Sequence, residues 1–313
     1  AVVTWTPGDV MIAENKGGLV SVVSTNEYRS QMPNVIIGIK KFMQDNRKSV
    51  ENMIAGFMEG GDQVKGYADA LKKAGEISNT VYHEAGTNPE YWVKYYKGQQ
   101  VADKTNQVVS LGGSRVHNLA DNLQYFGLAP GSSDIYNTVY NTFGTIVKNM
   151  YPNLVPSYPE YSEVVDLSYL KNVQSTFAPS QITQADVVKF DTDRGIQNTV
   201  SRKNWNITFQ TGSAQFTPEA ESQLEQIYAQ TAIASGLQIK ISGHTDNQGS
   251  DAINIPLSQA RADAVRQWME NKGCVSFRGR ITVKGYGSTD PIADNTSELG
   301  RKQNRRVEIL MGN

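Results

Sequence analysis

The chain has 313 residues and a nearly balanced charge, with 30 Lys and Arg against 31 Asp and Glu. A formal net charge of −1 argues against an overall electrostatic grip on nucleic acid. One cysteine and three dispersed histidines exclude an internal disulfide, a Cys-rich zinc site and a local histidine cluster, and the apolar runs are too short to span a bilayer.

The first part of the chain predicts a mostly helical region, residues 1–177. Thirteen of the 15 tyrosines lie before residue 200, which sets this region apart in composition. An apolar run at 34–39 predicts a short strand, and Gly60-Gly61 is expected to end the first long helix. Helical periodicity then predicts helices at 46–59, 65–77, from Asn88-Pro89 onward, 114–125, 133–150 and 166–173. The stripes Ile135/Val139/Phe143/Val147 and Val50/Ile54/Met58 are expected to be core.

Residues 178–202 predict a connector, because Gln, Thr, Ser and Asp dominate there with weak periodicity. One short strand is expected within it, at 186–190. The remaining residues, 203–313, alternate between strand and helix patterns. Strands are predicted at 205–211, 238–243, 280–285 and 306–311, with helices at 217–234, 256–271 and 297–303. This order predicts an α/β sandwich, with helices on one face of a mixed sheet.

Two charged residues stand out in this second region. On a helical wheel at about 100° per residue, Arg261 lies about 40° from Leu257, inside an apolar stripe. A guanidinium there must reach an edge or meet an anion, because burying it unpaired would cost several kcal/mol. Asp246 leaves the end of the preceding strand and is the nearest carboxylate by topology.

Two interpretations of this pair remain open. The first is a plain salt bridge between Asp246 and Arg261, which ties the loop to the helix. The second is a split pair that holds a zwitterion: Arg261 clamps a ligand carboxylate and Asp246 accepts from a ligand ammonium. Such a site suits the amino-acid end of a ligand. It contains no nucleophile–base couple, so it is expected to bind rather than to react.

The other polar motifs carry no chemistry of their own. His244 has no titratable neighbour in sequence and is expected to be a hydrogen-bonded structural histidine beside the turn. The Gly285–Gly287 turn lacks the pattern of a phosphate loop, and the basic cluster Asn304–Arg306 is typical of a solvated strand end. No catalytic triad, Cys/His pair or paired-carboxylate spacing supports an enzyme. We therefore predict no catalytic residue, no metal and no cofactor.

Residues 203–313 resemble the OmpA-like C-terminal, peptidoglycan-associated domain. The resemblance rests on ordered motifs with the expected spacing: Phe209–Ala214, Gly243–Asp246, Asn254–Ala262, Gly285–Gly287, Pro291, Asn295, Gly300-Arg301 and Asn304–Ile309. It implies a β/α sandwich that binds peptidoglycan non-covalently through the diaminopimelate of the stem peptide. The matching positions imply that Asp246 and Arg261 hold the ligand, that Asn254 and Arg305 complete the pocket, and that Thr245 and Leu257 line it.

The first region resembles the last part of a type 2 periplasmic solute-binding protein of the nitrate/sulfonate/taurine type. The resemblance rests on Val3–Pro7, Leu19–Glu27, the run at 34–39 and the helix from Asn46. It implies that the sequence begins part-way through such a fold, so no ligand-binding residue is transferred. A helical spacer or partner-docking domain is the alternative for this region.

Together these features predict a non-enzymatic protein in the periplasm or cell envelope of a Gram-negative-type bacterium, in the region of the outer membrane. Its C-terminal domain would grip peptidoglycan, while the N-terminal region would meet an envelope protein partner or a small solute. An alternative function is the cell-wall anchor of a motor or secretion assembly. The motor-type relatives need a membrane-spanning segment, which this sequence does not contain.

Overall fold

The computed structural model describes residues 3–4, 8–24, 27–30, 35–111, 113, 116–177, 190–272 and 279–313. They fall into two compact units. The first unit comprises residues 1–26, 35–123 and 166–186, and the second comprises 27–34, 124–165 and 187–313. The boundaries predicted from composition, near residues 177 and 203, remain a prediction. Within the described residues, no helix has the length and hydropathy of a membrane span.

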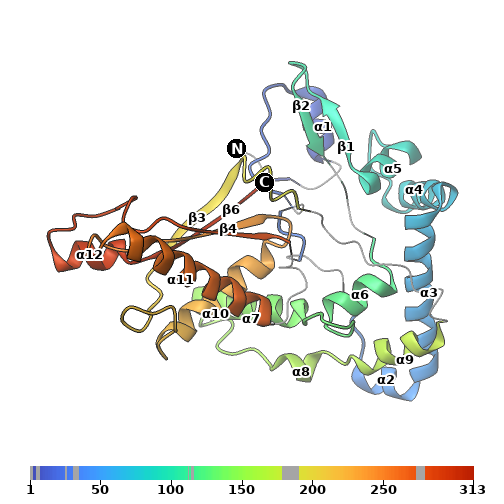
Figure 1. Cartoon of the computed structure of the whole chain (residues 1–313). Coiled ribbons are helices and arrows are strands. Elements are labelled where there is room, and N and C mark those ends of the chain that lie inside the picture. The colour runs from blue at the N-terminus through green and yellow to red at the C-terminus, as the bar shows by residue number, and fades with distance from the viewer. Residues whose placement is uncertain are drawn as a thin grey trace. The chain divides into compact units, whose positions relative to one another are not determined.

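The first unit is mainly helical, as the sequence predicts (Figure 1). Its buried apolar side chains include Leu71, Trp92 and Val173. Helix α4 packs against α5, and α3 packs against α4 and α9. The elements are α1 (Gly8–Asn15), α2 (Lys40–Asp45), α3 (Arg47–Gly66), α4 (Ala68–Tyr82), α5 (Pro89–Lys97), β1 (Gln99–Ala102), β2 (Val108–Leu111), most of α6 (Leu119–Tyr125) and α9 (Ser168–Thr176).

Two helix boundaries in this unit can be compared with those predicted from capping and glycine residues. The cap at Asn88 is confirmed: its side chain accepts from the backbone N–H of Tyr91 at 2.8 Å, with Pro89 in the first turn. The predicted stop at Gly60-Gly61 is wrong, because α3 continues to Gly66. A Cβ on Gly61 would lie 2.5 Å from the carbonyl oxygen of His117, so this glycine permits a close backbone approach instead of ending the helix.

Strands in the first unit differ from the prediction. The run at 34–39 was expected to be a strand, but residues 35–39 belong to no strand and Ile37 is 88% exposed. A strand needs a hydrogen-bonded neighbour, and none of the described residues pairs with this segment. The antiparallel hairpin of β1 and β2 was not predicted, because each strand is only four residues long.

The second unit contains the predicted β-α-β-α-β-α-β order and the mixed sheet, which confirms the fold class. The strand order is β3-β6-β4-β5; β4 and β5 are parallel, and the other two pairings are antiparallel. The elements are α7 (Ile135–Met150), α8 (Tyr161–Val164), β3 (Thr199–Trp205), α10 (Ala220–Ile233), β4 (Gln238–Gly243), α11 (Asp251–Asn271), β5 (Ile281–Gly285), α12 (Glu298–Asn304) and β6 (Val307–Gly312).

One apolar core lies between the sheet and the helices α10 and α11. Its buried members include Leu224, Ile227, Ile239, Ile241, Val265, Met269, Val307 and Ile309. Helix α7 packs against α10, and its residues Ile135 and Val139 join the same core (Figure 1). The stripe predicted for this helix is therefore core at Ile135 and Val139, with Phe143 partly buried, but Val147 is 37% exposed. The core of the second unit includes residues well before 203.

Two glycines place α11 close to the ends of β4 and β5. A Cβ on Gly243 would lie 2.1 Å from the carbonyl oxygen of Ser258, and one on Gly285 would lie 2.4 Å from the backbone nitrogen of Gln259. Any larger residue would push the helix away from the sheet. This close approach brings the middle of α11, including Arg261, near the loop that follows β4.

Three predicted boundaries in the second unit are wrong. The strand expected at 205–211 lies at Thr199–Trp205, because these polar residues pair with β6 as an edge strand and lack a continuous apolar pattern. The capping box expected at Thr217 does not form: α10 begins at Ala220, and the Thr217 hydroxyl bonds that of Thr208. Helix α11 begins at Asp251, so Pro256 lies inside it.

Some predictions concern residues outside those that the structure describes. The first four residues of the strand expected at 186–190 and the first part of the connector belong to residues 178–189. The expected helix stop at Gly273 and the single cysteine, Cys274, belong to 273–278.

Candidate functional site

Asp246 lies in the loop that follows β4, and its surroundings fix it. The side chain is largely buried, and its Oδ1 accepts from the backbone N–H of Gln248 at 3.0 Å. The buried Asn254, in the first turns of α11, donates from Nδ2 to the backbone oxygens of Asp246 at 3.4 Å and Gln248 at 3.1 Å. The extra helical turns before Pro256 therefore hold the loop that presents the carboxylate.

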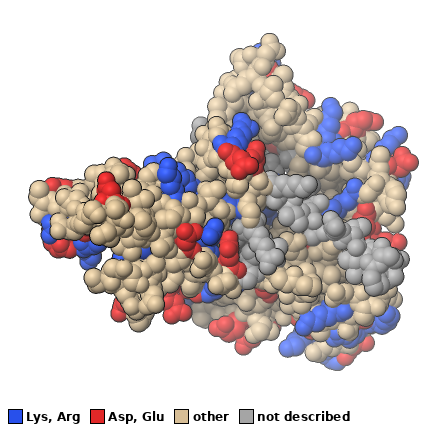
Figure 2. Space-filling model, viewed as in Figure 1, with Lys and Arg blue, Asp and Glu red and all other residues tan. Residues whose placement is uncertain are grey.

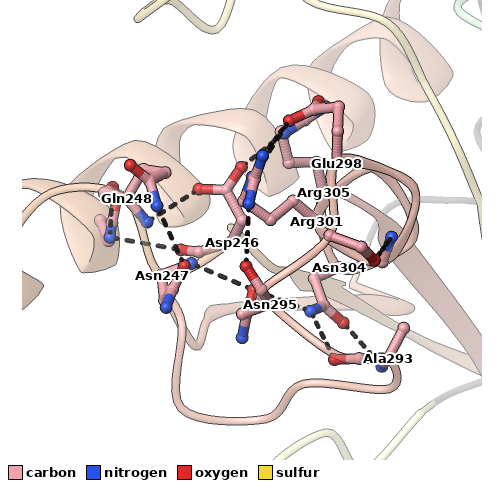
Figure 3. A network of polar contacts seen from close by, with 12 residues as sticks. Asp246, Asn247, Gln248, Ala293, Asn295, Glu298, Arg301, Asn304 and Arg305 are labelled. Carbon is pink, nitrogen blue, oxygen red and sulfur yellow. Dashed lines mark hydrogen bonds and ion pairs between the residues drawn. The ribbon is translucent and has the colours of Figure 1, made fainter.

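The second oxygen of Asp246 bonds an arginine from the end of the chain (Figure 3). Arg305 Nη1 donates to Asp246 Oδ2 at 2.5 Å, and its Nη2 donates to Glu298 Oε1 at 2.7 Å. Arg301 bonds the other oxygen of Glu298 through Nε and Nη2, at 3.0 and 2.8 Å. The bonds to Glu298 and Asp246 raise the pKa of Arg305. Four side chains thus form one chain of alternating charge.

The sheet topology explains why Arg305 reaches Asp246. Strand β6 runs antiparallel to β4, with Val307 opposite Gly243, so the residues before β6 meet those after β4. The fully buried Asn304 fixes this crossing, because its Oδ1 accepts from the backbone N–H groups of residues 292 and 293 at 2.8 and 3.0 Å. Its Nδ2 also donates to Asn295 Oδ1 at 2.9 Å (Figure 3).

Arg261 is half-buried on α11 and only partly bonded. Its Nε donates to the backbone oxygen of Ser213 at 3.0 Å, and its guanidinium lies 4.9 Å from the ring centroid of Phe209, which stacks on Phe216. Among the hydrogen bonds of the described residues, none involves its two terminal nitrogens. Burial lowers the pKa of Arg261, Asp246 opposes that shift and Arg305 adds to it. The Phe209 ring and the Ser213 carbonyl therefore orient the guanidinium, and its terminal nitrogens can bond an anion.

The salt bridge between Asp246 and Arg261, one of the two interpretations of the sequence, is not formed: Asp246 pairs with Arg305 instead. The helical wheel also needs correction. The buried stripe of α11 runs through Asn254, Ser258, Ala262, Val265 and Met269, so Leu257 lies on its flank and Arg261 at its edge. From that edge the guanidinium can reach the loop side of the domain.

The remaining predicted site residues lie on the same loops and helix. Thr245 is buried, and its backbone N–H bonds the carbonyl oxygen of Gly287 at 2.8 Å. Its hydroxyl has no hydrogen-bond partner among the described residues. Leu257 is half-buried, one turn before Arg261. The structure therefore gathers Asp246 and Arg305 directly, and places Thr245, Asn254, Leu257 and Arg261 around them. Their role in binding remains a prediction.

His244 and Arg306 pack beneath this loop. The buried His244 ring stacks on Tyr286 with centroids 5.3 Å apart, and burial, with a smaller effect of Arg306, lowers the pKa of His244 to about 4. The ring is neutral at neutral pH and packs on Tyr286. The hydrogen bond expected for His244 is not formed, because neither ring nitrogen has a partner among the described residues. The interpretation of residues 304–306 as a solvated strand end is wrong: Asn304 and Arg306 are buried, and Arg306 donates to the backbone oxygen of Asp290 at 3.1 Å.

The sequence did not single out Glu298, or the stacked rings of Phe209 and Phe216 beside Arg261. Glu298 is exposed at the start of α12 and looks like an ordinary N-terminal acid of a helix. Its only local signal is the spacing to Arg301, three residues on, which matches a helical ion pair. Its bond to Arg305, seven residues on, depends on the chain folding back toward β6.

The arrangement can bind a ligand with charges of both signs. It offers a partly bonded guanidinium, a carboxylate and a second arginine within one set of loops. Within the described part of the chain, no group of three or more His, Cys, Asp and Glu residues is placed to hold a metal ion. Figure 2 shows basic and acidic side chains interspersed over the visible face, in keeping with the net charge near zero. Recognition at this site would thus depend on local charges.

Comparison with known proteins gives a family for part of the second unit. The OmpA family model matches residues 208–305. Outer membrane protein P5 from Haemophilus influenzae is 36% identical over 117 residues, which cover 34% of this chain and 33% of that protein. Peptidoglycan-binding protein ArfA from Mycobacterium bovis is 36% identical over 105 residues, which cover 34% and 32%. The chain thus spans about a third of the length of these relatives.

Among solved structures, the peptidoglycan-associated lipoprotein from Burkholderia pseudomallei is similar to this chain with a TM-score of 0.31 and 26% identity. The match covers 34% of this chain and 87% of that structure. The solute-binding resemblance of the first region remains a prediction. The family expected from the motifs of the second region is confirmed: residues 208–305 of this chain form an OmpA family domain.

Proposed function

We propose that the OmpA family domain binds peptidoglycan non-covalently, through the zwitterionic end of the diaminopimelate in the stem peptide. The observation that carries the proposal is the half-buried guanidinium of Arg261 near Asp246, whose terminal nitrogens make no hydrogen bond among the described residues. A carboxylate of the ligand would bond those nitrogens in a bidentate pair. The ligand ammonium would then bond Asp246. The relative named as a peptidoglycan-binding protein supports this ligand.

The supporting residues hold this geometry in place. Asn254 fixes the loop that carries Asp246, and Thr245 offers a buried hydroxyl that has no partner among the described residues. Leu257 supplies apolar surface on the flank of α11, and Arg305 pairs with Asp246 at the rim. The proposal assigns no catalytic residue, since the site holds charges and no nucleophile–base couple. The relative named for the outer membrane supports a location in the cell envelope, on the side that faces the wall.

We propose further that the first unit is a module that this domain tethers to the wall. The first unit is compact and buries apolar side chains of its own, among them Leu71, Trp92 and Val173, and so can be carried as a separate body. Its exposed apolar side chains, among them Val22, Ile37 and Phe57, support a role in meeting an envelope partner or solute.

A sacculus pull-down tests the peptidoglycan proposal. The full chain is mixed with purified sacculi, and the bound fraction is measured for wild type, Asp246→Ala and Arg261→Ala. Each substitution removes one of two charge-assisted contacts, so binding should weaken by about 30-fold or more. Asp263→Ala and Arg266→Ala are matched controls on α11, where these two residues pair with each other at 2.9 Å. Full retention by both site variants would contradict the assignment.

A further inference from the structure

Asp246 is already paired with a cationic side chain, Arg305, where the proposed function places the ligand ammonium. Arg305 Nη1 lies 2.5 Å from Asp246 Oδ2, and the side chain of Asp246 is only 10% exposed. An arginine and an ammonium compete for one buried carboxylate oxygen, because each needs a short, direct hydrogen bond to it. Binding of the ammonium therefore requires Arg305 to loosen or leave.

Glu298 is placed to receive Arg305 when it leaves. Arg305 uses two different nitrogens for its two acids, Nη1 for Asp246 and Nη2 for Glu298 (Figure 3). Losing the bond to Asp246 would thus leave the bond to Glu298 intact. Arg305 is also 38% exposed, so its guanidinium has room to turn. Once free of Asp246, Arg305 keeps its bond to Oε1 of Glu298, while Arg301 holds the other carboxylate oxygen.

Arg301 holds Glu298 ready for this role. It bonds Oε2 of Glu298 through two nitrogens and anchors itself by donating from Nη1 to the backbone oxygens of Asn295 and Thr296 at 3.0 and 3.1 Å. The two arginines lower the pKa of Glu298, which keeps it ionised near neutral pH. Glu298 therefore remains a fixed negative charge beside Arg305.

We propose that Arg305 is a displaceable internal counter-ion of Asp246, and that Glu298 is the positioning residue that holds Arg305 once a ligand ammonium takes its place. This inference rests on the proposed function, since it describes how the same site opens. It explains how a buried carboxylate stays paired without ligand, which avoids the cost of an isolated buried charge. Binding then exchanges one cation for another.

The test is a titration of the full chain with two probes: a stem tripeptide that ends in meso-diaminopimelate, and the same peptide with the side-chain amine acetylated. Arg305→Gln removes the competing cation, so the free-amine peptide should bind about threefold more tightly. Glu298→Gln removes the acceptor of Arg305, so the same peptide should bind about threefold more weakly, the scale of one exposed ion pair. Glu225→Gln, which removes the exposed partner of Lys272 on α10, should change nothing.

Two further comparisons isolate the mechanism. In an Arg305→Gln background, Glu298→Gln should no longer weaken binding, because no arginine remains to be held. The acetylated peptide has no ammonium on its diaminopimelate side chain, so Arg305→Gln should not strengthen its weaker binding and Glu298→Gln should not weaken it. Thermal unfolding of each variant checks that the fold is kept.

The outcomes separate this inference from the proposed function. If Asp246→Ala abolishes binding and Arg305→Gln does so as well, Arg305 contacts the ligand directly and the counter-ion role is overturned, while peptidoglycan binding stands. If Glu298→Gln weakens binding equally with and without Arg305, Glu298 does not act through Arg305. If wild type binds neither probe nor sacculi, both proposals fail.

Discussion

Buried carboxylates in the two units are satisfied in different ways. In the first unit, Asp103 accepts five hydrogen bonds, from the backbone N–H groups of Gly18, Leu19, Thr105 and Gln107 and from the Thr105 hydroxyl. These bonds lower the pKa of Asp103 to about 2. In the second unit, Asp246 receives one backbone N–H and one arginine, which it shares with Glu298.

The difference separates structural charges from binding charges. Asp103 is held by backbone donors that move only if the β1–β2 hairpin and residues 18–19 separate, so no ligand can replace them without local unfolding. The partner of Asp246 is an exposed side chain that can turn away. A carboxylate with a replaceable partner, beside a partly bonded arginine, is a candidate for recognition, whereas a fully bonded carboxylate stabilises the fold.

The largest expected effect concerns a buried pair in the first unit. Lys65 Nζ lies 2.6 Å from Oδ2 of Asp121, whose side chain is 2% exposed. Lys65→Met removes the cation and leaves the carboxylate buried, which should cost about 3 kcal/mol of unfolding free energy. Urea unfolding measures the loss, and sacculus binding should stay unchanged. Lys73→Met, at an exposed pair on α4, is the control and should cost less than about 0.5 kcal/mol.

If Lys65→Met instead left the stability unchanged and reduced wall binding, the contrast between a structural charge in the first unit and a binding charge in the second would be broken.

A second prediction concerns the buried imidazole beneath the site. The pKa of His244 falls from its ordinary value of 6.5 to about 4, mainly through burial, with Arg306 and Lys240 acting in the same direction and Asp290 opposing them. Between these values the unfolded chain binds a proton that the folded chain does not. Stability is therefore present above pH 6.5 and is lost as pH falls toward 4. From pH 6.5 to 5 the loss should be about 2 kcal/mol.

Urea unfolding of wild type and His244→Gln at several pH values between 7 and 5 measures this contribution. The unfolding free energy of the variant should fall less steeply with falling pH than that of wild type, whatever its value at pH 7. If the unfolding free energy of the variant depended on pH as that of wild type does, His244 would not be a buried, neutral ring in the folded protein.

The smallest expected effect is at Thr245. Its buried hydroxyl has no partner among the described residues, so Thr245→Val should change the unfolding free energy by less than about 1 kcal/mol, in the stabilising direction. If the hydroxyl meets the ligand, the same variant should bind sacculi about threefold more weakly. A clear loss of stability would show that the hydroxyl is bonded within the fold, which would place Thr245 with the structural polar groups.

The sequence predicted the order of strands and helices in the OmpA family domain because each element carries a local pattern. The cap at Asn88 and the core stripe of α7 were predictable for the same reason. Strand β3 was misplaced because an edge strand of polar residues has no such pattern. Gly61 was taken for a helix stop because its close packing against residue 117, far along the chain, leaves no pattern in the local sequence.

The candidate site shows the same limit. Asp246 and Arg261 were brought together by their positions around one strand and one helix. The pairing of Asp246 with Arg305 follows from β6 lying beside β4, which joins residues 59 positions apart. Glu298 enters the site only through Arg305. Contacts set by sheet order are beyond local patterns, so the internal counter-ion could not be predicted from spacing alone.

The most direct test of the central claim is a crystal structure of the full chain with a stem tripeptide that ends in meso-diaminopimelate. We expect a ligand carboxylate on the terminal nitrogens of Arg261, the ligand ammonium within hydrogen-bond distance of Asp246, and Arg305 paired with Glu298 alone. A peptide bound away from Asp246 and Arg261 would contradict the account of this site.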